Sequence, residues 1–429
     1  MTNHSTSPRT RGRLDLLYRL SQTFNSSLDL DEVLNRVMDE VIAAMKAERG
    51  FVMLLDENNR LVFKVARGID QHTIDDPQFQ VSLSIVERVA IEGQPILTSD
   101  ARSDERFSMR QSVMLLGLRS ILCVPLILKD KTLGVIYVDN HLQSGIFSVS
   151  DQDLLTAIAS NASIAIENAR LYLLAVEKGR LERELQMARQ VQASLLPDTA
   201  PQVPGWEFAA TWQPARQVAG DYYDFIPFED GRVGLVIADV TDKGMPAALF
   251  MAMTRSVIRA SITSAASPAE GIAKANHLIC ADSTDGMFVT LFYAQIDPQS
   301  AEVTYVNAGH DPPLFYHLHA KTRQGQLAML ERTGMVLGIL KDTPFTQNKV
   351  KLSPGDFILL YTDGVTDAHN AQRKFFGIDK IQSLITQHQH QPAQVVLSTL
   401  IQSVGDFTGE TDPFDDITVA MIRRLPVGE

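Results

Sequence analysis

The sequence predicts an α+β protein in which two domains are joined by a long helix. The chain has 429 residues, more than a single hydrophobic core usually serves. Both halves contain apolar residues at helical spacing together with short apolar runs of strand length. Between the halves, a helical pattern without any proline runs from about residue 150 to 196. We therefore expect domains at 14–172 and 204–426, with a connecting helix at 173–196.

Composition excludes several classes of protein. The chain is 45% hydrophobic and 21% charged, as globular proteins are, and its net charge of −12 argues against nucleic acid as a partner. No apolar run approaches the roughly 20 residues that cross a membrane, so we expect a cytoplasmic protein. Cys123 and Cys280 stand alone in apolar surroundings and form no disulfide framework. Residues 1–13 are rich in Ser, Thr and Arg, and we expect them to be disordered.

The first domain alternates helices with pairs of strands. Asp56 to Asn59 is a turn between two short apolar runs, and Lys129 to Lys131 separates two more, so each pair predicts a β-hairpin. Ser27 or Asp29 can cap the second helix, and Ser150 can cap the long one. The expected helices are 14–24, 30–45, 83–91 and the helix from 150, and the expected strands are 50–55, 61–66, 119–128 and 132–139.

The connecting helix carries a heptad pattern. Two series of positions recur every seven residues and together predict a coiled-coil seam, with polar residues at two of its positions. This favours a homodimer; the alternative is one amphipathic helix packed on its own domain. The two series are Leu174, Leu181, Ala188 and Leu195, and Leu171, Lys178, Leu185 and Gln192.

The second domain contains many strands and a few long helices, which predicts stacked sheets. Strand-like runs lie at 208–212, 233–238, 288–296, 303–308, 357–362 and 417–422, and helical patterns at 246–264, 268–281, 377–388 and 392–404.

Four aspartates lie at or beside these apolar runs: Asp221, Asp239, Asp363 and Asp415. An unpaired buried carboxylate costs several kcal/mol, so four of them in one domain indicate a cation site. Carboxylate oxygens are hard ligands, which favours Mg²⁺ or Mn²⁺ over zinc.

Six motifs in the second domain and its approach, taken in order, resemble the SpoIIE/RsbU-like branch of the PPM phosphatases, relatives of protein phosphatase 2C. They are Glu184 to Pro197, Ala219-Gly220-Asp221-Tyr222-Tyr223-Asp224, Asp239-Val240-Thr241-Asp242-Lys243-Gly244, Asn307-Ala308-Gly309-His310, Tyr361-Thr362-Asp363-Gly364 and Asp415-Asp416-Ile417-Thr418. Asp242 stands where the family often has Gly, and Ala219 replaces another frequent Gly.

The resemblance implies an αββα sandwich that binds two Mg²⁺ or Mn²⁺ ions. By this resemblance Asp221 would bridge or bind the ions, and Asp239 would bridge both, with the Val240 carbonyl beside it. Asp363 and Asp415 would complete the ligands of the second ion; Asp415 is chosen over Asp416 by its position in the motif. The implied reaction is hydrolysis of phosphoserine or phosphothreonine by an activated water, without a protein nucleophile. The implied substrate is a phosphorylated STAS-type anti-anti-sigma factor.

Two further residues allow two interpretations each. Arg216 lies five residues before Asp221, the spacing of the phosphate-holding arginine in protein phosphatase 2C, so it either grips phosphate or is a solvated loop residue. His310 is either a general acid or a structural histidine, and its position at a strand end favours the structural role.

The first domain resembles a GAF sensor domain, on its order of elements and on Cys123-Val124-Pro125-Leu126, Gly134-Val135-Ile136, Phe147 and Asp151. The resemblance implies an unknown small-molecule ligand. Cyclic nucleotide is disfavoured, because Phe147 can be a core residue and Asp151 a first-turn acid of the long helix. The expected whole is a GAF-controlled phosphatase; the alternative is a dimeric GAF sensor on an inactive phosphatase fold.

Overall fold

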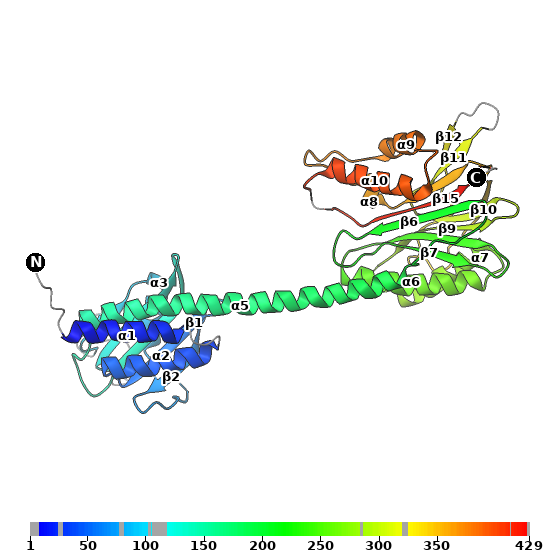
Figure 1. The fold of residues 1–429 in the computed structure, drawn as a ribbon. Helices are drawn as coiled ribbons and strands as arrows, with labels where there is room; N and C mark the ends of the chain where they lie inside the picture. Colours follow the sequence, from blue (N-terminus) through cyan, green and yellow to red (C-terminus); the bar gives the residue numbers. More distant parts are fainter. Residues whose placement is uncertain are drawn as a thin grey trace, which may run out of the picture. The chain divides into compact units, whose positions relative to one another are not determined.

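The computed structural model describes residues 8–24, 29–76, 81–101, 104, 118–283, 286–319, 325–411 and 413–426. It divides into two compact units, residues 1–179 and 180–429, each with its own cores. Helix α5 (Val149–Leu195) contributes residues to both units. Figure 1 shows the elements along the chain.

The first unit is one antiparallel sheet with helices on both faces. The strand order is β2-β1-β5-β4-β3, and both predicted hairpins are present within it. The strands are β1 (Arg49–Leu55), β2 (Leu61–Gly68), β3 (Ile96–Thr98), β4 (Ser120–Leu128) and β5 (Lys131–Asn140). The helices other than α5 are α1 (Pro8–Phe24), α2 (Leu30–Met45) and α3 (Leu83–Glu92).

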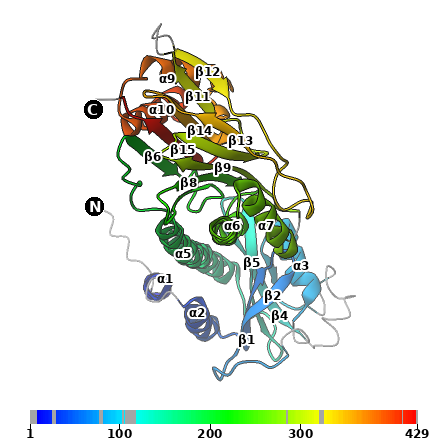
Figure 2. The ribbon, with the colours of Figure 1, turned by 90° about the vertical axis from the view of Figure 1, so that its right-hand side faces the viewer.

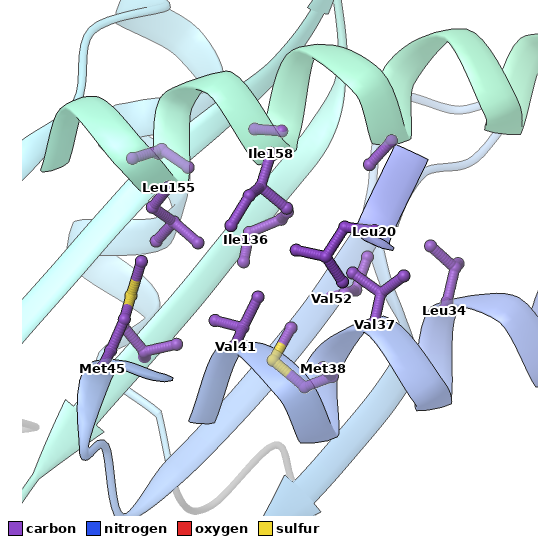
Figure 3. Close-up of a cluster of buried hydrophobic side chains, with 14 of the residues drawn as sticks. Leu20, Leu34, Val37, Met38, Val41, Met45, Val52, Ile136, Leu155 and Ile158 are labelled. Carbon is purple, nitrogen blue, oxygen red and sulfur yellow. The ribbon is translucent and has the colours of Figure 1, made fainter. Parts of the chain in front are cut away.

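The larger core of this unit lies between one face of the sheet and α1, α2 and α5. Figure 3 shows Met38 and Val41 of α2, Leu20 of α1 and Ile158 of α5 converging on the sheet. The Asp29 carboxylate accepts hydrogen bonds from the backbone N–H groups of Asp31 and Glu32, so Asp29 is the cap of α2. The opposite face of the sheet packs on α3 in a second core.

Phe147 and Asp151 have the structural roles that the alternative to a cyclic-nucleotide motif predicts. Phe147 is buried in the larger core. The Asp151 carboxylate accepts hydrogen bonds from the backbone N–H and the hydroxyl of Ser148, at 2.9 and 2.6 Å, and so caps the start of α5. Both residues are accounted for without a ligand.

The second unit has four layers, in the order helices, sheet, sheet, helices (Figures 1 and 2). One sheet has the order β13-β10-β9-β8-β7 and packs on α6 and α7; the other has the order β12-β11-β14-β15-β6 and packs on α9 and α10. A third apolar core lies between the two sheets. The αββα sandwich implied by the resemblance is therefore confirmed.

The six strand-like runs of this unit are strands β6 (Trp206–Gln213), β8 (Val233–Val240), β9 (Val289–Asp297), β10 (Glu302–Ala308), β14 (Phe357–Tyr361) and β15 (Ile417–Arg424). Its long helices are α6 (Met245–Thr263), α7 (Pro268–Asp282), α9 (Ile378–Gln387) and α10 (Ala393–Thr408). The elements that the pattern did not predict are β7 (Tyr222–Pro227), β11 (Leu314–Leu318), β12 (Gly325–Met329), β13 (Asn348–Lys351) and the single turn α8 (Asp363–Thr366).

Two sequence expectations need correction. Helix α1 begins at Pro8, inside the segment expected to be disordered, because the helical pattern of residues 14–24 extends towards the N-terminus. The heptad seam also does not continue along the whole connecting helix. Leu171, Leu174 and Leu181 are about half exposed, but Gln192 is only 5% exposed. Its side chain bonds within the second unit, so the face around Gln192 serves that unit and not a partner helix.

Within the described ranges, no helix is both long enough and apolar enough to span a bilayer.

Gly134 tests the packing of the first sheet. It pairs with Leu54 across β5 and β1, and a Cβ at Gly134 would overlap the Met53 carbonyl oxygen. We expect Gly134→Ala to cost roughly 1–3 kcal/mol, because backbone cannot move aside as a flexible side chain can. Thermal unfolding of the full chain followed by circular dichroism measures this loss. Gly179→Ala is the control: a Cβ there meets nothing within 4 Å in helix α5, so stability should hold or rise. Equal melting curves for Gly134→Ala and wild type would contradict the packing described here.

Candidate metal and phosphate site

The four predicted aspartates come from both sheets of the sandwich, at neighbouring strand ends. Asp221 immediately precedes β7, and Asp239 is the next-to-last residue of β8, the strand that pairs with β7. Asp363 opens α8 directly after β14, and Asp415 lies two residues before β15, the neighbour of β14. The sequence placed these residues at strand ends; the pairing of the strands brings them together.

Asp221 is the most deeply buried of the four, at 2% exposure. Its Oδ2 accepts hydrogen bonds from the hydroxyls of Thr362 and Thr418, at 2.7 and 2.8 Å. Burial, and then the charges of Asp239 and Asp416, nevertheless raise its pKa well above the usual range of a carboxyl group. Two hydroxyls hold this carboxylate in place without neutralising it.

The pKa values of Asp239 and Asp363 are raised in the same way. Burial, followed by the charge of Asp363, raises the pKa of Asp239 to about 7. Burial, followed by the charge of Asp415, raises the pKa of Asp363 to about 6. Each carboxylate therefore lies close enough to the next to repel it, and an added cation would relieve the repulsion.

The structure separates the roles of Asp415 and Asp416. Both oxygens of Asp416 accept backbone N–H groups at 2.8 Å, one from Ala215 and one from Gly220. These bonds fix the loop before Asp221. Asp415 instead places Oδ2 2.8 Å from the ammonium of Lys243, beside the other carboxylates. This geometry supports Asp415 as the residue available to a cation and gives Asp416 a structural role.

Lys243 is a cation already present at the site. Its Nζ donates to the Phe414 carbonyl at 2.6 Å and lies 4.4 Å from the centre of the Phe414 ring. One ammonium, however, pairs with only one of the four carboxylates. Within the residues that the structure places, no three Asp, Glu, His or Cys side chains are already gathered so as to hold a metal ion.

Val240 lies close to the backbone just before Asp221, whereas Arg216 is an exposed residue earlier in the same loop. The Val240 carbonyl oxygen would be 2.9 Å from a Cβ at Gly220, so only glycine allows this close approach between the segment before β7 and the end of β8. Arg216 is exposed and follows Ala215 in the loop that Asp416 holds. Its position leaves the guanidinium free to reach solvent or a phosphate.

His310 has the surroundings of a structural residue. It is buried, with Nδ1 2.9 Å from the Thr290 hydroxyl and Nε2 3.1 Å from the Tyr361 carbonyl. Burial lowers its pKa to about 4. It fixes the turn before Thr362 and Asp363, which agrees with the structural interpretation.

Sequence reasoning gave no role to Thr362, Thr418, Lys243 or Asp416, although all four stand inside the quoted motifs. The signal was available for the threonines: each lies within three residues of one of the four aspartates at a strand end, where a hydroxyl can bond a neighbouring carboxylate. Which carboxylate it bonds depends on the stacking of the sheets and could not be read from spacing.

The family models match two parts of the chain. Residues 27–167 match the GAF domain, and residues 229–425 match stage II sporulation protein E (SpoIIE). Asp239, Asp363 and Asp415 lie inside the second range; Asp221 and Arg216 precede it.

Two curated relatives are similar over most of the chain. The phosphoserine phosphatase RsbU of Bacillus subtilis (strain 168) is 31% identical over 244 residues, which cover 57% of this chain and 71% of that protein. The protein IcfG of Synechocystis sp. is 30% identical over 296 residues, or 62% of this chain, but this chain spans only 46% of that protein.

Among solved structures, the SiaA-PP2C domain of Pseudomonas aeruginosa has the same fold as the second unit, with a TM-score of 0.52 and 21% identity. The match covers 58% of this chain and 99% of that domain. Fold, motifs and similarity agree: the chain belongs to the SpoIIE/RsbU-like family of PPM phosphatases and carries a GAF domain ahead of its phosphatase domain.

Proposed function

We propose that this protein is a metal-dependent protein serine/threonine phosphatase. The observation that carries the proposal is the convergence of Asp221, Asp239, Asp363 and Asp415 at neighbouring strand ends, where burial and neighbouring carboxylates raise the pKa values of Asp221, Asp239 and Asp363. Carboxylates with raised pKa values at one site are a signature of function, because a structure built only for stability avoids such repulsion.

The residues fit a pair of divalent cations. Carboxylate oxygens suit Mg²⁺ or Mn²⁺, and the ammonium of Lys243 shows that a cation is stable beside Asp415. Asp221, Asp239, Asp363 and Asp415 would hold the ions, together with the Val240 carbonyl. Bound ions of this kind supply an activated water and stabilise the charge on the phosphate oxygens. Thr362 and Thr418 orient Asp221 through hydrogen bonds to its carboxylate. We propose that Arg216, exposed in the loop before Asp221, binds the phosphate.

The substrate that we propose is a phosphorylated regulatory protein, specifically a STAS-type anti-anti-sigma factor. Support comes from the similarity to RsbU, which is named a phosphoserine phosphatase. Neither Cys123 nor Cys280 is followed in the sequence by the Gly-rich loop ending in Arg that cysteine phosphatases use. Burial also raises the pKa of the Cys123 thiol far above neutrality, and Cys123 lies in the GAF domain. The alternative of an inactive sensor gives no reason for the four carboxylates to converge.

We further propose that the protein acts as a homodimer and that a GAF ligand controls the phosphatase through α5. Leu171, Leu174 and Leu181 remain about half exposed and lie three and seven residues apart, as in a coiled-coil seam. A second copy of the helix would bury them. The C-terminal end of the same helix belongs to the phosphatase unit. A change in how two copies of the helix pair would therefore be transmitted along the helix to that unit.

The first prediction concerns metal dependence. Turnover of p-nitrophenyl phosphate and of a phosphoserine protein should require Mn²⁺ or Mg²⁺, stop in EDTA and return with excess Mn²⁺. Asp239→Asn should lower turnover by at least about 100-fold, because Asp239 would be one of the carboxylates that hold the ions and its loss would weaken cation binding. Asp230→Asn, an exposed carboxylate paired with Arg232, is the control and should match wild type. Full turnover in EDTA would contradict the proposal.

The second prediction concerns pH. The folded state keeps protons on Asp239 and Asp363 up to pH values of about 7 and 6, whereas the unfolded chain releases them near pH 4. The folded state thus binds more protons between these values, and the unfolding free energy falls as pH rises through that window. In EDTA, Asp239→Asn should remove part of the decrease in unfolding free energy between about pH 4 and pH 7. Its Tm at pH 8 should therefore exceed that of wild type by roughly 2–4 °C for each kcal/mol of repulsion removed.

The measurement for this prediction is the difference in Tm between Asp239→Asn and wild type from pH 5 to pH 8. Taking the difference cancels the titrating groups that do not interact with Asp239, and leaves the contribution of Asp239 together with its repulsion of Asp221 and Asp363. Asp230→Asn is again the control, because hydrogen bonds from Arg232 lower the pKa of Asp230 and its titration ends below this window. A difference that does not grow with pH would show that Asp239 is not under the repulsion described.

The third prediction concerns the dimer. Replacing Leu174 and Leu181 by Gln should convert a dimer to a monomer in light scattering and change Mn²⁺-dependent turnover. Both leucines are half exposed and lie in the helix away from the site, so folding of either unit should persist. Val176→Gln, an exposed apolar residue of the same helix that lies outside both heptad series, is the control. A variant that stays dimeric, or a monomer with unchanged turnover, would refute control by pairing.

A further inference from the structure

Gln192 is a buried amide in the last turn of α5. It is 5% exposed, while its helix neighbours Gln190 and Val191 are exposed. A primary amide has two donors and an acceptor, so burying it costs free energy unless it finds partners. The partners that it finds are backbone groups next to the candidate metal site.

The amide of Gln192 bonds both backbone groups of a single residue, Ala219. Its Nε2 donates to the Ala219 carbonyl at 2.8 Å, and its Oε1 accepts the Ala219 N–H at 3.0 Å. Ala219 is fully buried and precedes β7. The two bonds from Gln192 satisfy its backbone N–H and carbonyl, as pairing with a neighbouring strand would. Gln192 thus holds the chain two residues before Asp221.

The bonds from Gln192 are part of a set that fixes the Ala219–Asp221 segment from three directions. Asp416 accepts the Gly220 N–H at 2.8 Å, and the Trp212 indole donates to the Asp221 carbonyl at 2.9 Å. Asp416 and Trp212 belong to the sheet that contains β6 and β15 or to the loop before it. Gln192 is the member of this set that comes from the connecting helix.

Gln192 also contacts helix α6. Its Nε2 lies 3.5 Å from the Ala248 carbonyl in the first turn of α6, the helix that follows Asp239 along the chain. One side chain of α5 therefore contacts the backbone before Asp221 and the helix after Asp239.

We propose that Gln192 is a positioning residue for cation binding: it fixes the Ala219–Asp221 segment so that the Asp221 carboxylate faces the other three aspartates. The inference rests on the proposed function. It also names the contact through which a shift of α5 would reach the site, since α5 cannot move by a residue's length without breaking both bonds to Ala219.

The test is calorimetric titration of full-length protein with Mn²⁺ alone, for wild type, Gln192→Leu, Gln192→Glu and Gln190→Leu. Leu keeps the volume of the side chain without its hydrogen bonds. Glu keeps the acceptor for the Ala219 N–H but sets a carboxylate oxygen against the Ala219 carbonyl. Gln190→Leu is the matched control, an exposed glutamine on the same helix. Partners that orient metal ligands typically contribute 10- to 100-fold in affinity, so we expect both Gln192 variants to bind Mn²⁺ at least about tenfold more weakly.

The outcomes separate positioning from mere stability. A purely structural role would lower Tm and leave the Mn²⁺ affinity of the folded protein unchanged, and this result would overturn the proposal. A Mn²⁺ affinity of the Gln192 variants within twofold of wild type would also overturn the proposal, and so would an equal loss of affinity in Gln190→Leu. Loss of cooperative unfolding in both Gln192 variants would overturn it as well. If wild type binds no Mn²⁺, the proposed function itself fails; if wild type binds and the Gln192 variants bind equally well, only this inference fails.

Discussion

Repulsion among buried carboxylates is the constraint on which the second unit depends. Asp221, Asp239 and Asp363 are held near one another with raised pKa values, although separating them would lower the energy of the folded state. The sandwich overcomes this repulsion with two large apolar cores on the helix-covered faces and a third between the sheets. Packing energy from the whole domain thus holds together carboxylates that repel one another.

Hydrogen bonds decide how the carboxylates point. Thr362 and Thr418 bond one oxygen of Asp221, while Asp416 bonds the loop before it through two backbone N–H groups. These groups come from the strands of the opposite sheet or their ends, so the geometry of the site depends on how the two sheets stack. A change at the sheet interface would therefore alter the site without replacing any of its carboxylates.

The connecting helix differs along its length in which side chains are buried. Up to Leu181 it presents half-exposed leucines at heptad spacing, which suits a second copy of the helix. From Gln192 to Leu196 its buried residues belong to the phosphatase unit. A heptad pattern alone cannot distinguish these segments, because an apolar or amide side chain at the same helical phase can face a partner chain or its own domain.

The sequence by itself determined the two-domain α+β organisation, the principal strands and helices, and the family, because apolar periodicity and motif order are local properties of the chain. It also placed the four aspartates at strand ends. Tertiary structure decided the rest. Only sheet stacking assigns Thr362 and Thr418 to Asp221, and only the loop geometry separates Asp415 from Asp416. Strand β7 escaped the pattern because Asp224 lies buried within it, paired with Arg255 and Arg259 of α6, a partnership between residues more than 30 positions apart.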